Sequence, residues 1–267
     1  MSILLVLKLA LVPSLIGGVT LAGRRWGPGV AGWLSAFPVV SAPVLFFITI
    51  EQGAPFAAHA SAATLSAVLA ILVFGISYAW AALRYSWRIC TPFSFACYFV
   101  AVSVLNHWAP SLLAASIAVA IALGIAPYLY PKPPVPSTAA GSASKHDIWW
   151  RMVAGAVLVL LVTHFSSRLG PRLSGLFAMF PVIGSVLAVF SHKHSGTAFA
   201  VMLMRSMVLG YYAFACFCLV LALALPHMSI GLAFLASLGA AVVVQVVSRI
   251  YLRTQQGVQE RRIRAAP

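Results

Sequence analysis

Acidic side chains are almost absent from this sequence. Its 267 residues include three acids against 17 Lys and Arg, and only 7% of the chain is charged. A soluble domain carries about 25% charged residues, so this chain has too little charge to cover a surface that faces water. Most of its surface must meet lipid, where backbone polar groups are satisfied within a helix or a closed barrel. The three acids are Glu51, Asp147 and Glu260.

The alternation of apolar and polar residues that marks a membrane β-barrel is missing as well. The apolar runs instead continue for about 20 residues, the length at which an α-helix crosses a bilayer. With 62% of its residues hydrophobic, the sequence therefore predicts an all-α, polytopic bundle of transmembrane helices.

Signals for catalysis, cofactors and nucleic acid are also lacking. We find no Gly-x-Ser-x-Gly, no phosphate-binding glycine loop and no His-Glu-x-x-His. Cys216 and Cys218 would point to different sides of a helix, which argues against a metal pair. The basic residues form short clusters between apolar runs, as topology signals do. We expect no enzyme activity, no metal, no cofactor and no nucleic-acid partner.

The hydrophobic runs predict about nine spans. The fourth is the shortest, and Pro110 separates it from the fifth. The predicted limits are residues 2–22, 29–50, 56–82, 91–106, 110–129, 149–166, 172–191, 197–225 and 229–250.

Loop charges support this odd number of spans. Thirteen basic residues fall on one side of the membrane, whereas the other side receives Arg168 and Arg172, with Lys8 close to it. Because basic loops stay in the cytoplasm, we expect the C-terminus inside and the N-terminus outside a bacterial-type inner membrane. The thirteen are Arg24, Arg25, Arg84, Arg88, Lys132, Lys145, Arg151, Lys193, Arg249, Arg253, Arg261, Arg262 and Arg264.

The chain divides into two membrane units joined by a linker. Residues 1–130 hold about five spans and residues 149–252 hold about four. Residues 131–148 between them are rich in Pro, Ser and Ala without apolar periodicity, which is typical of a linker. Residues 253–267 form a polar, basic tail that we expect, like the linker, in the cytoplasm.

The two units share an internal repeat. The segment RWGPGVAGWLSAFPV at residues 25–39 reappears as RLGPRLSGLFAMFPV at residues 168–182, and the same offset of 143 residues relates Gly53 to Gly196. An odd number of spans between the copies would invert the second copy. Inverted repeats are common in secondary transporters, whose site lies at the repeat interface near the midplane. The alternative is a duplicated scaffold without a transport role.

Two prolines lie about ten residues inside the repeat helices, close to the middle of the membrane. Pro38 and Pro181 each remove a backbone hydrogen bond and leave a carbonyl without its donor. Such a carbonyl needs a partner in lipid, so we expect the two kinks to face protein or a water-filled cavity. Ser35, Ser41 and Ser185 lie near the kinks and are candidate liners of that cavity. The alternative is that each proline only curves its helix for packing.

A pattern of small and apolar residues runs through the second repeat. It comprises Gly175-Leu176, Phe180-Pro181, a short polar loop from His192 to Gly196, and Arg205 to Gly210. In this pattern, residues 170–210 resemble the GlpM-like family of small bacterial inner-membrane proteins. The resemblance implies membrane residence and a tandem duplication of such a unit. The first repeat matches less well, with Trp33 in place of the leucine and no counterpart of Arg205.

Arg205 lies about nine residues into the eighth predicted span, too deep for easy snorkelling. No acid in the sequence is an obvious partner for it. An intramembrane arginine of this kind suggests an anionic substrate, a lipid phosphate or the carbonyls freed at the proline kinks. The alternative is a span that begins later and brings Arg205 to the cytoplasmic headgroups.

Glu51 lies at the outer end of the second predicted span. His59 is close to it, and His164 lies on the same side at the end of the sixth span. A set of Glu and His residues can relay protons, because histidine titrates near neutral pH. The alternative is that all three simply lie at the membrane interface.

These features favour a small inner-membrane transporter or permease for a small solute, anionic if Arg205 lines the path, that binds between the kinked second and seventh helices. One alternative is an accessory or scaffold subunit of an envelope complex for polysaccharide or lipid assembly. A membrane-embedded enzyme that acts on lipid is disfavoured, because the sequence shows no polar cluster open to one leaflet. Membrane lipid is the expected partner, and a homo-oligomer or a protein partner is compatible with these functions.

Overall fold

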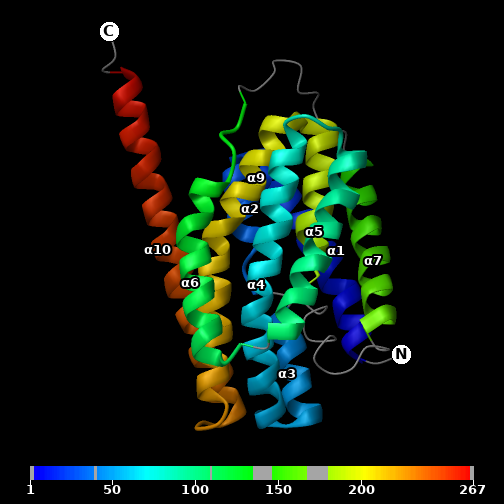
Figure 1. The fold of residues 1–267 in the computed structure, drawn as a ribbon, viewed down its shortest axis with the longest axis vertical. Helices are drawn as coiled ribbons and strands as arrows, with labels where there is room; N and C mark the ends of the chain where they lie inside the picture. Colours follow the sequence, from blue (N-terminus) through cyan, green and yellow to red (C-terminus); the bar gives the residue numbers. More distant parts are fainter. Residues whose placement is uncertain (1–2, 39–40, 109, 135–145, 167–179, 265–267) are drawn as a thin grey trace.

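Every secondary-structure element described for this chain is an α-helix, as the sequence predicts (Figure 1). The computed structural model describes residues 3–38, 41–108, 110–134, 146–166 and 180–264. Its helices are α1 (Ile3–Trp26), α2 (Pro28–Ser35), α3 (Ser41–Gln52), α4 (Ala54–Ala82), α5 (Trp87–Trp108), α6 (Leu112–Leu129), α7 (His146–Ser166), α9 (Val182–Ala224) and α10 (Ile230–Arg264).

Five of the described helices are long and apolar enough to cross a membrane. They are α4, α5, α6, α9 and the Ile230–Ile250 part of α10. The 43 residues of α9 are two helical segments joined at Gly196, so they do not form one continuous span. The chain is therefore a multi-pass helical membrane protein, and the number of about nine spans stays a prediction.

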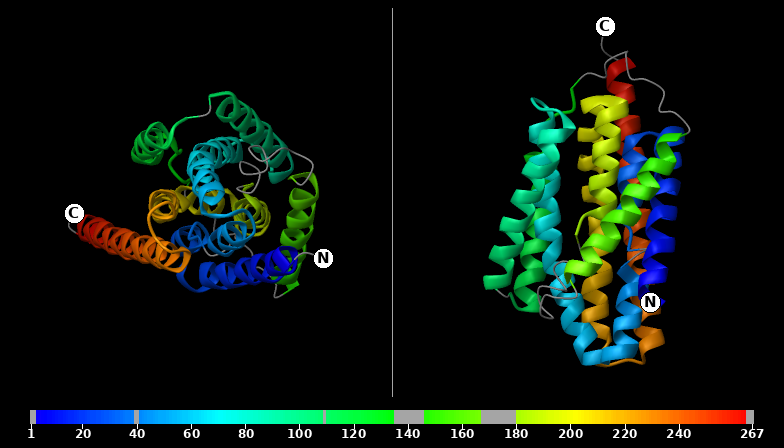
Figure 2. Two further views of the ribbon diagram at one scale, coloured as in Figure 1. Left: turned by 90° about the horizontal axis from the view of Figure 1, so that it is seen from below. Right: turned by 90° about the vertical axis from the view of Figure 1, so that its right-hand side faces the viewer.

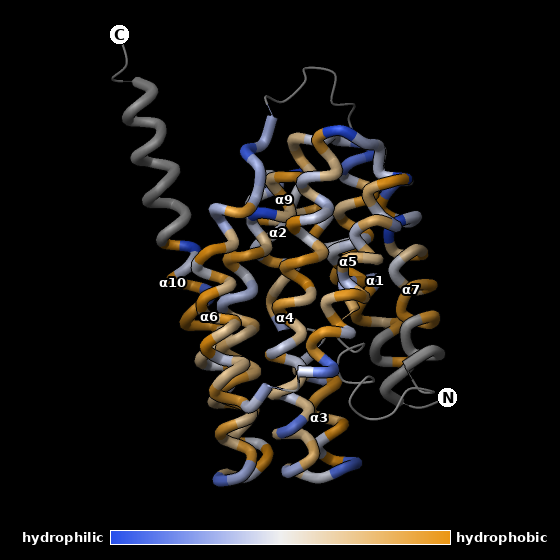
Figure 3. The backbone as a smooth tube through the Cα atoms, in the orientation of Figure 1, coloured by the Kyte–Doolittle hydropathy of each residue, from blue (hydrophilic) through white to orange (hydrophobic). Residues whose placement is uncertain are grey.

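Apolar side chains cover the outside of the bundle as well as its core. α4 and α9 lie in the middle, and α1, α5, α6, α7 and α10 surround them (Figure 2). On the outer faces, Ile117 and Ile121 of α6 and Val243 and Val247 of α10 are all more than half exposed. Soluble monomers rarely expose apolar surface on this scale. Lipid is the environment that suits this surface, and hydrophilic residues gather mainly toward the ends of the bundle (Figure 3).

The second predicted span, residues 29–50, is two helices and not one kinked helix. α2 ends at Ser35 and α3 begins at Ser41. Pro38 lies in the break between them, because it has no amide hydrogen to continue α2. Its carbonyl accepts a hydrogen bond of 2.9 Å from the amide of Ala42 and so starts α3. The proline therefore separates two helices where a kink was predicted.

The seventh and eighth predicted spans meet without the polar loop expected at residues 192–196. Pro181 stands at the N-terminus of α9, where its carbonyl accepts from the amide of Ser185 at 2.7 Å. The helix then continues to Gly196, whose non-helical backbone (φ 83°, ψ 174°) divides α9 into two segments. The expected loop is therefore absent. The residues before and after Gly196 are helical, and Gly196 alone makes the turn. The first part of the seventh span, residues 172–179, lies outside the described residues.

Three glycines connect consecutive helices within a single residue. Gly27, Gly53 and Gly196 have φ values of 87°, 86° and 83°, and their ψ values of 172°, 163° and 174° complete a conformation that is essentially confined to glycine. At Gly53 the amide donates to the carbonyl of Thr49 at 3.0 Å, and the carbonyl accepts from the amide of Ala57 at 3.2 Å. Each glycine thus ends one helix and begins the next.

The helix boundaries recur with the same offset of 143 residues as the sequence repeat. Each matched pair begins a helix or makes a glycine turn, and the correspondence extends beyond the segment in which the sequences are alike. The pairs are the turns at Gly53 and Gly196, and Trp87 and Ile230 at the starts of α5 and α10.

α2 crosses the second segment of α9 at very short range. A Cβ atom on Gly32 would overlap the hydroxyl oxygen of Ser206 and the carbonyl oxygen of Leu203, and one on Gly210 would overlap Ala36. Small residues allow helix backbones to approach in this way inside a membrane. The crossing therefore fixes the position of α2 against the centre of the bundle.

We expect the Gly32→Ala variant to lose about 1–3 kcal/mol of stability, because the added methyl group has to push α2 away from α9. Gly29 lies in the same short helix, and a Cβ atom there would meet nothing within 4 Å. Gly29→Ala is therefore the matched control, with an unchanged or slightly raised midpoint of thermal unfolding in mild detergent. Equal midpoints for the two variants would contradict the close crossing.

The turn at Gly196 gives a second test. A Cβ atom at this position meets no atom within 4 Å, so any loss in Gly196→Ala comes from the positive φ alone. We expect a loss of about 1–3 kcal/mol in thermal unfolding. Gly239→Ala is the control, since Gly239 is equally unobstructed but lies inside a helix, where alanine is favoured by about 0.5–1 kcal/mol. A neutral Gly196→Ala variant would show that this turn is not constrained.

Candidate functional site

A cavity of about 370 Å³ with both apolar and polar lining residues lies where α1, α7 and α9 meet. Ala31 of α2 and Leu203 of α9 contribute to its apolar lining, next to the close crossing of these two helices. Its polar lining comes from three helices and comprises Thr20 and Arg24 of α1, Arg151 of α7, and Ser191 and Ser195 of α9.

Asp147 holds the charged groups around this cavity together. Its side chain is only 3% exposed, and its Oδ2 accepts a hydrogen bond of 2.7 Å from Nε of Arg151. The same oxygen lies 3.6 Å from Nη2 of Arg24, and Oδ1 lies 3.6 Å from Nε2 of His194. One buried carboxylate is thus shared by basic groups from three helices.

Arg151 is fixed on several sides and is as deeply buried as its acid. The side chain is 4% exposed, and its Nη1 donates to the hydroxyl of Ser191 at 3.4 Å. Its guanidinium lies over the ring of Phe190, 5.4 Å from the centroid, and that ring stacks on His194. These contacts hold the arginine in place at the wall of the cavity.

Local sequence explains why these charges meet at helix ends. Arg24 lies in the last turn of α1 and Asp147 in the first turn of α7, the ends at which the helix dipole favours a cation and an anion, respectively. Asp147 and Arg151 are four residues apart on α7, so their side chains lie on one face. α1 and α7 run antiparallel, which brings the two helix ends together.

The cavity wall combines two arginines with incomplete hydrogen bonding. Arg24 and Arg151 both line the cavity, and the buried carboxylate of Asp147 lies beside them. The Thr20 hydroxyl oxygen in the wall, and Oδ1 of Asp147 and Nδ1 of His194 nearby, are buried and have no hydrogen-bond partner among the described residues. Buried polar groups are normally satisfied. The cavity therefore presents guanidinium and hydroxyl groups that can donate hydrogen bonds.

The predicted liners of the proline kinks do not line this cavity. Pro38 and Pro181 are both buried. The hydroxyl of Ser35 donates to the carbonyl of Gly32 at 2.8 Å and that of Ser185 to the carbonyl of Val182 at 3.1 Å, each within its own helix or helix end. Ser41 is half-buried at the start of α3.

Arg205 is half-buried on α9, two residues beyond Leu203 of the cavity wall. It does not belong to the cavity lining, and it forms no ion pair or hydrogen bond with another described residue. Its predicted role in binding an anion therefore stays a prediction.

The proton-relay candidates lie away from this cavity. Glu51 at the end of α3 and His59 on α4 are exposed, and the described structure contains no ion pair between them. The side chain of His164 lies outside the described residues.

Sequence reasoning missed the acid at the centre of this site. Asp147 was assigned to the linker of residues 131–148, yet it belongs to the first turn of α7. Its spacing of four residues from Arg151 was the signal available in the sequence. His194, predicted in a solvated loop, pairs with the same carboxylate.

Comparisons with protein-family models, with curated proteins and with solved structures find no match for this chain. The resemblance of residues 170–210 to the GlpM-like family therefore stays a prediction.

Replacing Asp147 by leucine leaves Arg151 buried without its counter-charge. We expect a loss of about 3–5 kcal/mol in thermal unfolding in mild detergent. Glu51→Gln is the control, because it removes an exposed acid and should change stability by less than about 0.5 kcal/mol. The double variant Asp147→Leu/Arg151→Met should recover most of the loss, since an apolar pair can replace a buried ion pair. A wild-type midpoint for Asp147→Leu would contradict this role.

Proposed function

We propose that this chain is a small membrane transporter or permease for a small anionic solute, which binds in the cavity between α1, α7 and α9. The observation that carries the proposal is that two arginines, Arg24 and Arg151, line one cavity beside the buried carboxylate of Asp147. Charged groups inside a membrane protein are costly to bury and commonly mark a substrate or ion pathway.

A twofold arrangement of the chain supports transport over a static role. The repeat offset relates α1 to α7, yet these two helices pack antiparallel. In the same way the offset relates α4 to the second segment of α9, and these two helices lie side by side and run in opposite directions (Figure 1). We infer two inverted repeats, the architecture that many secondary transporters use for alternating access.

The surroundings of the cavity favour the cytoplasmic side. Lys193 lies 6.0 Å from the ring centroid of Trp87, and Arg88 lies over the same ring. Trp149 and Trp150, beside the cavity arginine Arg151, are each 66% exposed. Basic loops and exposed tryptophans together are typical of a cytoplasmic membrane interface. The proposed topology places the cavity and the C-terminus inside and the N-terminus outside a bacterial-type inner membrane.

The close crossing of α2 and α9 bounds the cavity on the side that faces the centre of the bundle. Ala31 and Leu203 line the cavity, and Gly32 touches the backbone of Leu203. In the proposed mechanism the anion enters from the charged end, binds Arg24 and Arg151, and passes inward when α2 moves away from α9. Arg205, half-buried two residues beyond Leu203, is the next cation along α9 and the candidate second contact.

Uptake into proteoliposomes tests the proposal, with radiolabelled phosphate, sulfate and acetate as probes. We expect the wild type to carry at least one of them above the rate of protein-free vesicles. Arg24→Gln should lower that rate about ten- to hundredfold, because a hydrogen bond to a charged group is lost. Arg84→Gln is the control, since Arg84 is exposed in the turn between α4 and α5. Arg205→Ala in the same assay tests whether the path passes Arg205.

The alternatives give different results. A scaffold subunit for envelope assembly would carry none of the three anions, and Arg24→Gln and wild type would not differ. A lipid-acting enzyme would convert lipid in the vesicles, which mass spectrometry of the extracted lipid detects. A transport rate that is equal in wild type and Arg24→Gln would overturn the assignment of the cavity.

A further inference from the structure

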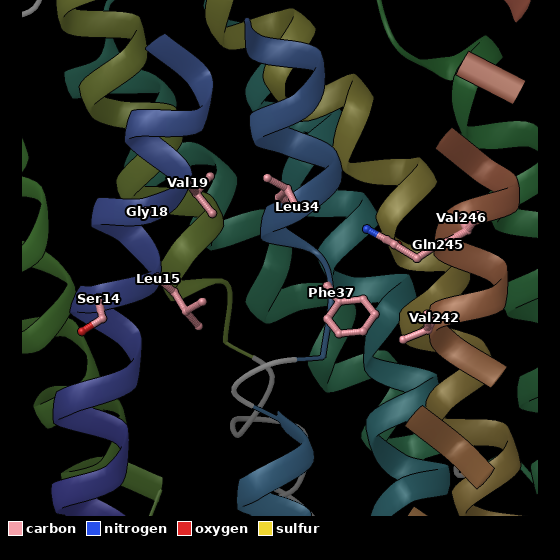
Figure 4. A pocket seen from close by; sticks show the side chains of 9 residues that line it. All are labelled: Ser14, Leu15, Gly18, Val19, Leu34, Phe37, Val242, Gln245 and Val246. Carbon is pink, nitrogen blue, oxygen red and sulfur yellow. The ribbon is translucent and has the colours of Figure 1, made fainter. Parts of the chain in front are cut away.

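An apolar groove of about 400 Å³ opens on the side of the bundle between α1, α2 and α10. Val242 and Val246 at its edge are about half exposed, and Gly18 is exposed. The groove therefore opens where the outer surface faces lipid. Figure 4 shows Leu15 and Val19 on α1, Leu34 on α2, Phe37 just after it, and Val242 and Gln245 on α10 around the opening.

The equivalent place in the other half of the molecule is filled. Phe180, the counterpart of Phe37, lies 5.0 Å, 5.5 Å and 6.0 Å from the ring centroids of Phe95, Tyr98 and Phe99 on α5. At the matching positions α10 has smaller side chains, so Phe37 has no aromatic partners on that helix. These smaller residues are Leu238, Ala241 and Val242. The groove is therefore open beside Phe37, whereas aromatic side chains fill the corresponding place beside Phe180.

A buried polar atom belongs to this groove. Gln245 is 6% exposed and lines the groove. Its Nε2 donates to the carbonyl of Trp33 at 3.0 Å, whereas its Oε1 has no hydrogen-bond partner among the described residues. An unpaired amide oxygen in apolar surroundings is unfavourable. A ligand in the groove would need a hydrogen-bond donor to satisfy it.

Two arginines stand above the groove on its two long walls. Arg249 lies one turn beyond Gln245 on α10, about 6 Å along the axis, and it is exposed over the ring of Trp33. Arg25 lies two turns beyond Gly18 on the same face of α1 and is also exposed. Arginine binds phosphate well at a membrane surface.

We propose that this groove binds a single-chain phospholipid with a free glycerol hydroxyl, a lysophospholipid. Its one acyl chain lies along the apolar wall formed by α1, α2 and α10. The glycerol hydroxyl donates to Oε1 of Gln245, and the phosphate, one step farther out, lies between Arg249 and Arg25. The proposal is independent of the anion cavity, whose lining residues are different except for Val19.

Native mass spectrometry in mild detergent tests this site by titration with oleoyl lysophosphatidic acid and with oleyl phosphate, which has no hydroxyl. We expect one tightly bound lysophosphatidic acid, held about fivefold more tightly than oleyl phosphate, the effect of one hydrogen bond. Gln245→Met should remove this preference, so that both ligands bind equally. A purely structural role of Gln245 would not change the ratio between the two ligands.

A variant whose side chain fills the groove provides the second part of the test. Gly18→Phe should weaken binding of either ligand at least about tenfold, because the new ring occupies the position of the acyl chain. Gly124→Phe, at an equally exposed and unobstructed glycine of α6, a helix that does not line the groove, should bind as the wild type does. Equal binding of the two ligands by the wild type, or unchanged binding by Gly18→Phe, would overturn the proposal. A wild-type dimer that Gly18→Phe converts to a monomer would also overturn it, since a second copy would then cover the groove.

Discussion

The close crossing of α2 and α9 is the contact on which the rest of the structure depends. Gly32 and Gly210 leave no room for a Cβ atom, so the two backbones touch in the middle of the bundle. This contact holds a helix of only 8 residues, too short to be stable alone, in the centre of a membrane protein. The cavity lined by Arg24 and Arg151 lies on one side of α2, through Ala31, and the lateral groove lies on the other, through Leu34.

Short helices inside a membrane raise the question of their free backbone groups, since lipid offers no hydrogen bonds. The structure pairs these backbone groups locally, within a few residues of each helix end. Glycines at positive φ let one helix end and the next begin at the same residue, as at Gly53. Pro38 has no amide hydrogen to satisfy, and its carbonyl is used at once by Ala42. The chain can therefore reverse or break within the bundle at little cost in unpaired groups.

The small number of acidic side chains limits how the basic side chains of this protein can be paired. Of the two acids whose side chains the structure describes, Glu51 is exposed and Asp147 is buried. The buried carboxylate accepts a hydrogen bond from Arg151 and lies 3.6 Å from Arg24, so one acid is shared between two arginines. Unpaired buried polar groups lie at the same place, where a low dielectric strengthens electrostatic interactions. The first half of the chain places Lys8 opposite Arg151 in the repeat but Leu4 opposite Asp147, so it has no carboxylate at the matching position.

The sequence by itself determined the helical class, the membrane environment and the repeat, because these depend on composition and on local periodicity. It also located the glycine pair Gly53 and Gly196, whose shared role in turns follows from a conformation open to glycine alone. It could not show that Pro38 breaks a helix instead of kinking it, since that depends on which partners the neighbouring carbonyls find. Only the tertiary structure brought Arg24, Asp147 and His194 together from three helices. Their contact depends on the antiparallel packing of α1 and α7 and on the turn at Gly196. The residue pattern within a single segment does not show which distant helix ends will meet.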